Sequence, residues 1–168
     1  MKKTIIKNNK KLIEKTLEIV NEKKVGKTAG EFLKWWANSE ERGMIREHLQ
    51  SIANIVYSRY RVKHLPVYVG KKYKIKCGGL THYNKFTCKP KSITIFVLFG
   101  WRFVKFSEMG FPIHAASYEA LIEVLAHELA HVVELAKNQN NSHNRDFYKR
   151  YEEILSFIKK EVLNESTV

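Results

Sequence analysis

The first third of the chain places its apolar residues at helical spacing. Over residues of about 4–22 they recur every three or four positions, which predicts an amphipathic helix. Gly26 and Gly30 interrupt the pattern, and a short helical segment with two adjacent tryptophans follows. From about residue 40 to residue 60 the helical spacing returns. We therefore expect residues 1–62 to form a helical N-terminal part.

The pattern changes near Pro66 to one typical of strands. Residues 63–100 are rich in β-branched and aromatic side chains and are punctuated by glycine and proline. This predicts two or three antiparallel strands with tight connections, arranged as a small sheet or hairpin. Residues of about 100–116 are expected to form a long loop.

The strongest helical pattern lies in the last third of the chain. It begins after Ser117, a favourable N-cap residue, and continues to about residue 138. A polar turn and a last helix of about residues 144–162 follow, so residues 117–162 are expected to form a helical hairpin. Helices, a small sheet and two more helices make an α+β fold. The whole chain, residues 1–168, suits one domain.

The helix that follows Ser117 contains the motif H-E-x-x-H, formed by His127, Glu128 and His131. Side chains four residues apart on a helix lie one turn apart, with Cβ atoms about 5–6 Å from each other, so two imidazoles can hold one ion. Catalytic zinc sites use three protein ligands and a water, which Glu128 is placed to reach. The alternative is a pair of hydrogen-bonded core histidines, but polar groups on a largely apolar helix favour a metal site.

A catalytic zinc site requires a third ligand, and three residues are candidates. His143 lies twelve residues after His131, past the polar turn, where a helical hairpin can fold it back. Glu134 lies one turn beyond His131, but ligands on three successive turns of one helix spread too far along its axis. His114, in the predicted loop, is the other alternative. We expect His143 to be the ligand.

The segments HELAH and HNRDF resemble the SprT-like metallopeptidases, the group that includes Spartan. The pattern of that family is H-E-x-x-H, a variable loop, and H-G-x-x-F. Phe147 matches its last position, whereas Asn144, a residue that tolerates unusual backbone angles, replaces the glycine. The segment GGLTHYNKFTCKPKSITIFV resembles the hairpin of the family, so the resemblance covers residues of about 65–160. The related YgjP-like peptidases, which have a shorter spacing, are the rival family.

The resemblance implies a zincin-like fold and a peptidase activity. Carried over residue by residue, it implies that His127, His131 and His143 bind one Zn²⁺ and that Glu128 is the general base and acid. For Spartan-type members it also implies the degradation of proteins crosslinked to DNA. Many SprT-like proteins have an added zinc-binding module, for which this chain lacks the cysteines, so contacts to DNA would come from the domain itself.

The charge of the chain points to a polyanionic partner. There are 30 Lys and Arg against 17 Asp and Glu, which gives a net charge of +13. Such a surplus favours nucleic acid or an anionic membrane surface, although a lysine-rich solvated surface is the plainer interpretation. The candidate nucleic-acid contacts mix cations with aromatic residues. They are Arg59, Arg61, Lys63, Lys71, Lys72 and Lys74, close to Tyr57, Tyr60 and Tyr68.

Several of these residues have a plainer interpretation. The tyrosines and the pair Trp35 and Trp36 can be packing residues instead of stacking surfaces. Lysines near residues 71–74 on an edge strand can discourage aggregation, or such an edge can align an extended peptide substrate. For the only aspartate, Asp146, we prefer a helix first-turn role over orientation of a histidine. For Tyr148 and Tyr151 we prefer packing over stabilisation of an oxyanion.

The remaining features concern the compartment. Cys77 and Cys88 are too few for a disulfide scaffold and are expected to be free thiols. No secretory signal or membrane-spanning segment is recognisable, so we expect a cytoplasmic monomer, or one associated with the nucleoid, and no membrane contact. Two hypotheses of function follow. The first is a zinc metalloendopeptidase that acts on protein near or on DNA. The second is a basic nucleic-acid-binding protein with a structural zinc site.

Overall fold

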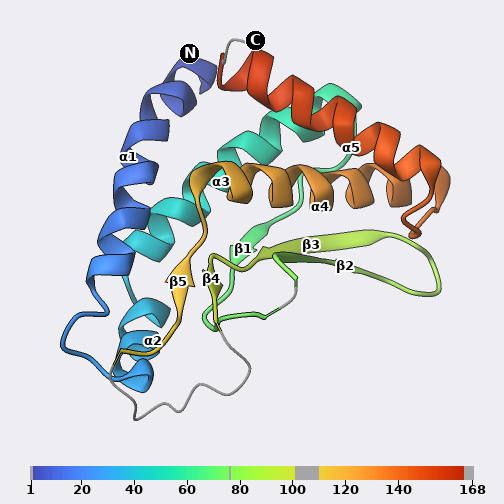
Figure 1. Ribbon diagram of the computed structural model, residues 1–168. Coiled ribbons are helices and arrows are strands. Elements are labelled where there is room, and N and C mark those ends of the chain that lie inside the picture. Colours follow the sequence, from blue (N-terminus) through green and yellow to red (C-terminus); the bar gives the residue numbers. More distant parts are fainter. Residues whose placement is uncertain (1, 76, 101–109, 165–168) are drawn as a thin grey trace.

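A computed structural model of the chain describes residues 2–75, 77–100 and 110–164, and it confirms an α+β fold (Figure 1). In chain order the elements are α1 (Lys2–Glu22), α2 (Ala29–Ala37), α3 (Glu40–Tyr60), β1 (Val67–Val69), β2 (Gly79–Tyr83), β3 (Pro90–Ile95), β4 (Leu98–Phe99), β5 (His114–Ala115), α4 (Tyr118–Asn138), α5 (Arg145–Phe157) and the π-helix η1 (Ile158–Val162). Most of the loop predicted over 100–116 lies outside the described residues. At its end β5 pairs with β4, which the loop prediction missed.

Polar caps fix where the helices begin. Ser117 caps α4 as the sequence predicts, because its hydroxyl accepts a hydrogen bond from the backbone N–H of Ala120 at 3.1 Å. At α2 the caps are reciprocal. The Thr28 hydroxyl accepts from the N–H of Glu31, and the Glu31 carboxylate accepts from the N–H of Thr28. These bonds satisfy backbone donors that the first helical turn leaves without partners.

The three-stranded sheet is mixed, with the strand order β1-β3-β2. β2 and β3 form the predicted antiparallel hairpin, in which Thr81 lies opposite Ile93. β1 pairs with β3 in parallel, with Val67 opposite Ile93, so the expectation of a wholly antiparallel sheet was wrong on this strand. The physical reason is that alternation of apolar and polar residues gives the face of a strand but not its direction.

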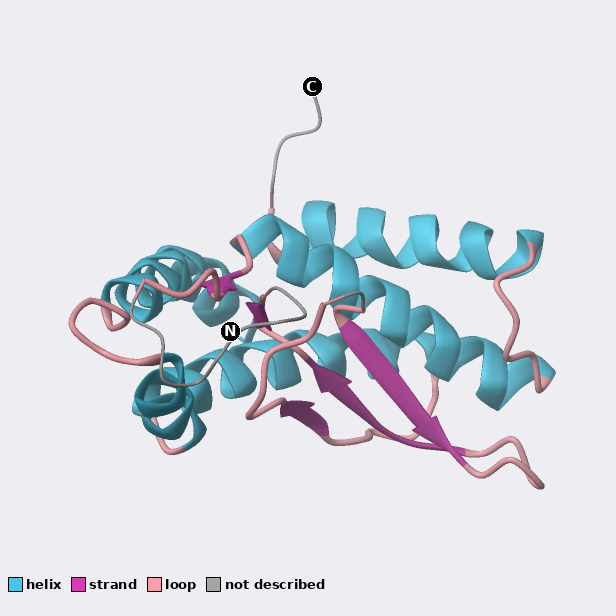
Figure 2. Ribbon diagram, turned by 60° about the horizontal axis from the view of Figure 1, so that its bottom comes forward, coloured by secondary structure: helices cyan, strands magenta, loops and turns pink. Residues whose placement is uncertain are grey.

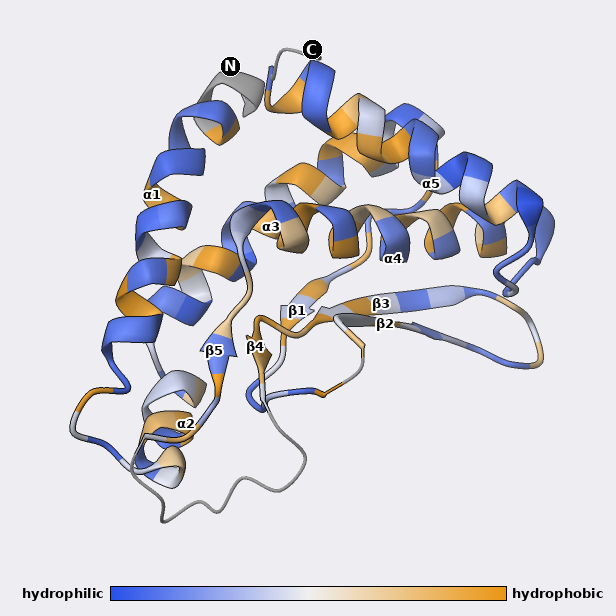
Figure 3. Cartoon of the chain, in the orientation of Figure 1, coloured by the Kyte–Doolittle hydropathy of each residue, from blue (hydrophilic) through white to orange (hydrophobic). Residues whose placement is uncertain are grey.

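Helix α4 is the central layer of the molecule. It packs against β2 and β3 on one side and against α5 on another, while α3 contacts both β1 and α4 (Figures 1 and 2). One hydrophobic core takes residues from α1 through to η1. Figure 3 shows that β3 changes from hydrophobic near β1 to hydrophilic toward the hairpin turn. The hairpin turn lies at the same end of the molecule as the turn between α4 and α5 (Figures 1 and 2).

Within the described part of the chain, no helix is both long and apolar enough to span a bilayer. The longest helices instead bury one side against the core. Trp36 of α2 also lies in the core. Its side chain is fully buried, and its indole N–H donates to the carbonyl of Gly70 at 2.9 Å. That tryptophan is therefore a packing residue, in line with its plainer interpretation.

A buried histidine makes the stability of this fold depend on pH. His48 of α3 is 5% exposed, and its Nε2 lies 2.7 Å from the hydroxyl of Tyr118 at the start of α4. Burial lowers the pKa of His48 to about 4. The folded state therefore resists protonation of a group that the unfolded chain protonates below a pH of about 6.5.

We expect the free energy of unfolding to fall as the pH drops from about 6.5 toward 4, by up to about 3 kcal/mol from this residue. His48→Gln keeps a polar partner for Tyr118 but cannot titrate, so its stability should vary less over this range. Denaturant unfolding of both proteins at several pH values measures the difference. Equal pH dependence in the two proteins would contradict the assignment to His48, since all other histidines are shared.

Candidate metal centre

Three imidazoles converge where the N-terminus of α5 meets the middle of α4. His127 and His131 lie one turn apart on α4, and His143 reaches them from the turn before α5. The Nε2 atom of His143 lies 3.2 Å from that of His127 and 3.0 Å from that of His131. One nitrogen from each of the three rings lies within 4.8 Å of the other two. The structure thus brings together the three ligands expected from the sequence.

The spacing of these nitrogens suits a metal ion. Ligands at about 2.0–2.1 Å from a tetrahedral zinc lie about 3.3 Å from each other, close to the observed separations. Hydrogen bonding explains the cluster less well. Each ring nitrogen has one in-plane direction, for either a proton or a lone pair, and Nε2 of His143 cannot align with two neighbours at once. Three lone pairs directed at one point are what a metal ion requires.

Burial favours the neutral form of His127 and His131, which is the form that binds metals. The pKa of His131 is lowered to about 4, first by burial and then by the neighbouring His127 and His143. The pKa of His127 is also lowered, by burial and by His143. His143 itself is exposed, so the cluster opens to solvent on one side.

Phe147 packs against all three imidazole rings. It is fully buried, and its ring stacks on that of His131 with centroids 4.3 Å apart. The rings of His127 and His143 each meet it edge-on at 4.9 Å. Since Phe147 lies on the first turn of α5, it couples the position of that helix to the orientation of the imidazoles. The sequence matched this residue to a motif but did not reveal this contact.

Glu128 lies beside the histidines but is not part of the converging group. It is 5% exposed, and its Oε2 accepts a hydrogen bond of 2.6 Å from the hydroxyl of Thr81 on β2. Burial raises the pKa of this carboxyl, while the bond from Thr81 opposes that shift. Glu128, Thr81 and the three histidines line one cleft of about 390 Å³.

Two glycines let β2 approach α4 closely enough for this contact. A Cβ atom on Gly79 would lie 2.8 Å from Cγ of Glu128 and 3.0 Å from Cγ1 of Val124. A Cβ on Gly78 would lie 2.6 Å from Cγ2 of Val124. In the sequence these glycines stand only as breaks in a strand pattern and as the start of the segment that resembles the family hairpin. Neither they nor Thr81 were recognisable as site residues, because nothing in a strand pattern gives its register against a helix.

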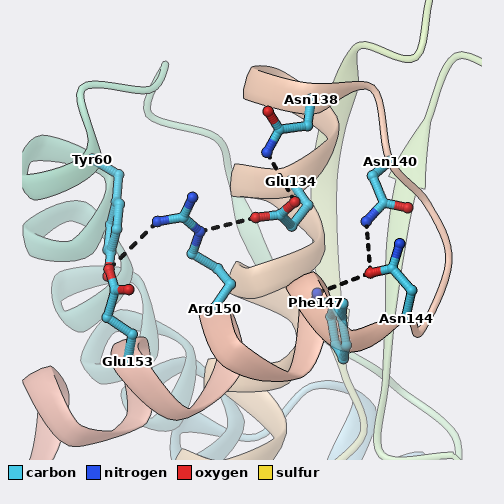
Figure 4. Close-up of polar contacts among 8 residues, drawn as sticks. All are labelled: Tyr60, Glu134, Asn138, Asn140, Asn144, Phe147, Arg150 and Glu153. Carbon is cyan, nitrogen blue, oxygen red and sulfur yellow. Dashed lines mark hydrogen bonds and ion pairs between the residues drawn. The ribbon is translucent and has the colours of Figure 1, made fainter.

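Glu134, the competing ligand on α4, has a different role. Its side chain is buried, and its carboxylate accepts hydrogen bonds from Nε of Arg150 and from the amide of Asn138, both at 3.0 Å (Figure 4). Arg150 also contacts Glu153, which accepts a bond from Tyr60 of α3 at 2.6 Å. This network joins three helices and leaves Glu134 unavailable to a metal ion.

The other competing ligand, His114, lies on β5. Its ring packs against Phe99 of β4, with centroids 6.2 Å apart, and it is not part of the histidine cluster. Asn144, which replaces the glycine of the SprT-like pattern, has an ordinary φ of −83°. Its tolerance of unusual angles is therefore not used. Instead its side chain caps α5 by accepting from the N–H of Phe147 at 3.0 Å, a bond that glycine cannot make (Figure 4).

The secondary candidates lie around the cluster. Asp146 is exposed in the first turn of α5, where the helix dipole favours a negative charge. The ring of Tyr151 lies 6.0 Å from that of His127, and burial raises the pKa of the Tyr151 hydroxyl. Tyr148 is 52% exposed, with its ring 6.4 Å from that of His143. Asp146 thus has the first-turn placement preferred from the sequence, and both tyrosines lie beside the histidine cluster.

The proposed nucleic-acid contacts of α3 and the segment after it fall on two surfaces. Arg59 and Arg61 are exposed and line a cleft of about 750 Å³ beside the end of α3. Lys63 lines a different cleft of about 530 Å³ between α4 and the β2–β3 hairpin. Two of the aromatic residues among them are buried, since Tyr57 is 0% and Tyr60 is 8% exposed. These two tyrosines are therefore packing residues and cannot stack on bases.

The other candidate lysines, Lys71, Lys72 and Lys74, follow the C-terminal end of β1. Lys71 and Lys72 are exposed, whereas the ammonium of Lys74 lies 4.9 Å from the ring of Phe96. Lys74 pairs with Phe99 of β4 through one isolated β-bridge and is not itself part of a named strand. These lysines therefore do not lie on the edge strand beside the histidines. Cys77 and Cys88 are both free, as expected, and Cys77 lines the histidine cleft.

The chain matches no model of a known protein family, no curated protein and no solved structure.

We expect purified protein to bind one zinc ion per chain, because the histidine cluster supplies three nitrogens with suitable spacing. His143→Ala should lose the ion or bind it far more weakly, and elemental analysis after dialysis measures this. His114→Ala is the matched control, since it removes an imidazole outside the cluster. Retention of one tightly bound ion by His143→Ala would contradict the ligand assignment.

Gly79→Ala should destabilise the protein by about 1–3 kcal/mol, because the added methyl group overlaps Glu128 and Val124. Gly43→Ala is the matched control. Gly43 lies in the first turn of α3, where an added Cβ meets nothing within 4 Å, so that change should stabilise the helix by up to about 1 kcal/mol. Denaturant unfolding distinguishes the two. An unchanged stability in Gly79→Ala would mean that β2 and α4 are not in close contact.

Proposed function

We propose that this chain is a zinc-dependent metalloendopeptidase of the SprT-like type. The observation that carries the proposal is the arrangement in one open cleft of three converging histidine nitrogens and a buried glutamate held by Thr81. The resemblance of HELAH and HNRDF to that family supports the same residues in the same roles. Proteins bound or crosslinked to nucleic acid are the substrates that the net charge of +13 favours.

The residues present fit the chemistry of peptide hydrolysis. His127, His131 and His143 would hold a zinc ion, which would lower the pKa of a water to about 7 and polarise a carbonyl oxygen. Glu128 accepts the proton of the attacking water and delivers it to the leaving nitrogen. Its raised pKa brings it closer to the range in which a carboxyl can both take and return a proton. The hydrogen bond from Thr81 fixes one oxygen of the Glu128 carboxylate and, through it, the direction of the other oxygen.

The sheet offers a place for an extended substrate. In the described part of the chain β2 is an edge strand, because the strand order is β1-β3-β2. Gly79, Leu80 and Thr81 of this strand line the same cleft as the histidines. A peptide that pairs with the free edge of β2 would pass its backbone along the cleft, with main-chain hydrogen bonds giving affinity. This favours an endopeptidase over an enzyme that requires a chain terminus.

The number of ligands favours catalysis over a structural zinc site. Structural sites are closed by four protein ligands, whereas catalytic sites keep a position for water. Among the described residues only three side chains converge, and the exposed His143 leaves the cluster open. The hydrophobic core consists of apolar residues from α1 through to η1 and includes none of the three histidines. A chelator should therefore remove activity while most of the helical structure survives.

Glu128→Gln should keep the zinc ion but lower the rate of hydrolysis by at least about 100-fold, since an amide cannot transfer the proton. Cleavage of casein and of a DNA-bound protein, followed by gel electrophoresis, measures the rate. Elemental analysis of the same preparation establishes that the metal is retained.

The matched control is Glu123→Gln, an exposed glutamate on the same helix, which should cleave as the wild type does. Two results would reject the proposal. One is full activity of Glu128→Gln. The other is an inert wild-type protein that unfolds when zinc is chelated, as expected of a structural site.

A further inference from the structure

The turn between β2 and β3 holds an aromatic side chain away from the protein. Phe86 is 98% exposed, more than any other large hydrophobic residue among those described. Exposure of a single phenylalanine forgoes the free energy of its burial, about 1.5–3 kcal/mol. The flanking residues, Lys85 and Thr87, are polar and exposed, so they offer no apolar surface against which the ring could pack.

Local hydrogen bonds hold together the turn that presents this ring. The side-chain oxygen of Asn84 accepts hydrogen bonds from the N–H groups of Phe86 at 2.9 Å and Thr87 at 3.1 Å. Two backbone bonds close the turn, from the N–H of Asn84 to Lys89 and from the N–H of Cys88 to Asn84. A local hydrogen-bonded turn of this kind lowers the entropy cost of holding Phe86 in one place.

Lysines without an ion pair lie close to Phe86 in the sequence. Lys85, Lys89 and Lys91 are exposed, and none forms an ion pair with a described residue. The sequence extends this imbalance. The 60 residues from His48 to Ser107 contain twelve Lys and Arg but no Asp or Glu, so nearly the whole net charge of +13 arises there.

We propose that the hairpin tip, residues 84–91, is a binding site for single-stranded nucleic acid. Phe86 stacks on a base, and Lys85, Lys89 and Lys91 neutralise phosphates on either side of it. Single strands expose both the aromatic face of each base and the charged backbone, and an aromatic residue among cations matches the two together. A duplex hides its base faces in the stack, so the tip discriminates against it.

A single-stranded polyanion fits this surface better than a membrane does. Membrane insertion of a turn needs several adjacent apolar side chains, and Phe86 is the only one between Asn84 and Lys89. The tip lies at the same end of the molecule as the α4–α5 turn (Figures 1 and 2). The amide of Asn141 in that turn donates to the hydroxyl of Tyr83 at 2.9 Å, and both residues line the histidine cleft.

The test is fluorescence anisotropy with labelled oligothymidine and oligouridine of about 20 nucleotides, which also distinguishes DNA from RNA. Phe86→Ala should weaken binding roughly 5- to 150-fold, and Phe86→Trp should retain it. Replacing Lys85, Lys89 and Lys91 by Gln should reduce the slope of log affinity against log salt by about 2. Because these side chains are exposed, the variants should keep the fold and one zinc ion per chain.

The matched control replaces Lys7, Lys11 and Lys15, three exposed lysines on α1, by Gln. It carries the same change in charge and should alter the salt slope much less. Equal effects of the two triple variants, or full affinity in Phe86→Ala, would overturn the proposal, because binding would then follow net charge alone. Binding to vesicles of anionic lipid that depends on Phe86, without binding to either oligonucleotide, would also overturn it. None of these measurements depends on hydrolysis, so an inactive protein can still support the site.

Discussion

The packing of α5 against α4 is the interaction on which the histidine cluster depends. One helix fixes His127 and His131, but His143 reaches them only if α5 begins at the right height and angle. Phe147 contacts all three rings and so sets where α5 begins along α4, and the partly buried ion pair of Glu134 and Arg150 fixes the rotation of one helix against the other. Such a pair adds little net stability, because Arg150 stays 22% exposed, so its contribution here is mainly one of position.

A second constraint acts from the other side of α4. The glycines before β2 bring the strand so close to the helix that Thr81 reaches the carboxylate of Glu128. The candidate ligands and the candidate base are thus oriented by different partners, α5 for the imidazoles and β2 for the glutamate. Substitutions on α5 and on β2 therefore act on different members of the site, although residues of the junction between α4 and α5 and of β2 line one cleft.

The features that the sequence predicted are those with a local periodic cause. Helical spacing gave the long helices, and the four-residue separation of His127 and His131 placed both on one face. His143 was expected because a residue beyond the turn can return to that face, and the structure decides between it and the alternative His114. The parallel pairing of β1, the burial of Tyr57 and the contact of Thr81 with Glu128 were beyond reach. Each depends on which segments meet in three dimensions, and alternation or composition carries no information about that.

The distribution of charge links the cleft to the hairpin tip. Lysine and arginine without acidic neighbours dominate the segment that forms the sheet, whereas the acidic residues lie almost entirely on the helices that precede and follow it. A polyanion is therefore attracted to the sheet side of the molecule, where the hairpin ends beside the α4–α5 turn. The bond between Tyr83 and Asn141 holds these two turns together at the wall of the cleft. If the tip binds single-stranded nucleic acid as proposed, a protein attached to that strand would be held next to the histidines, and its local concentration at the cleft would rise without any contact to its own sequence.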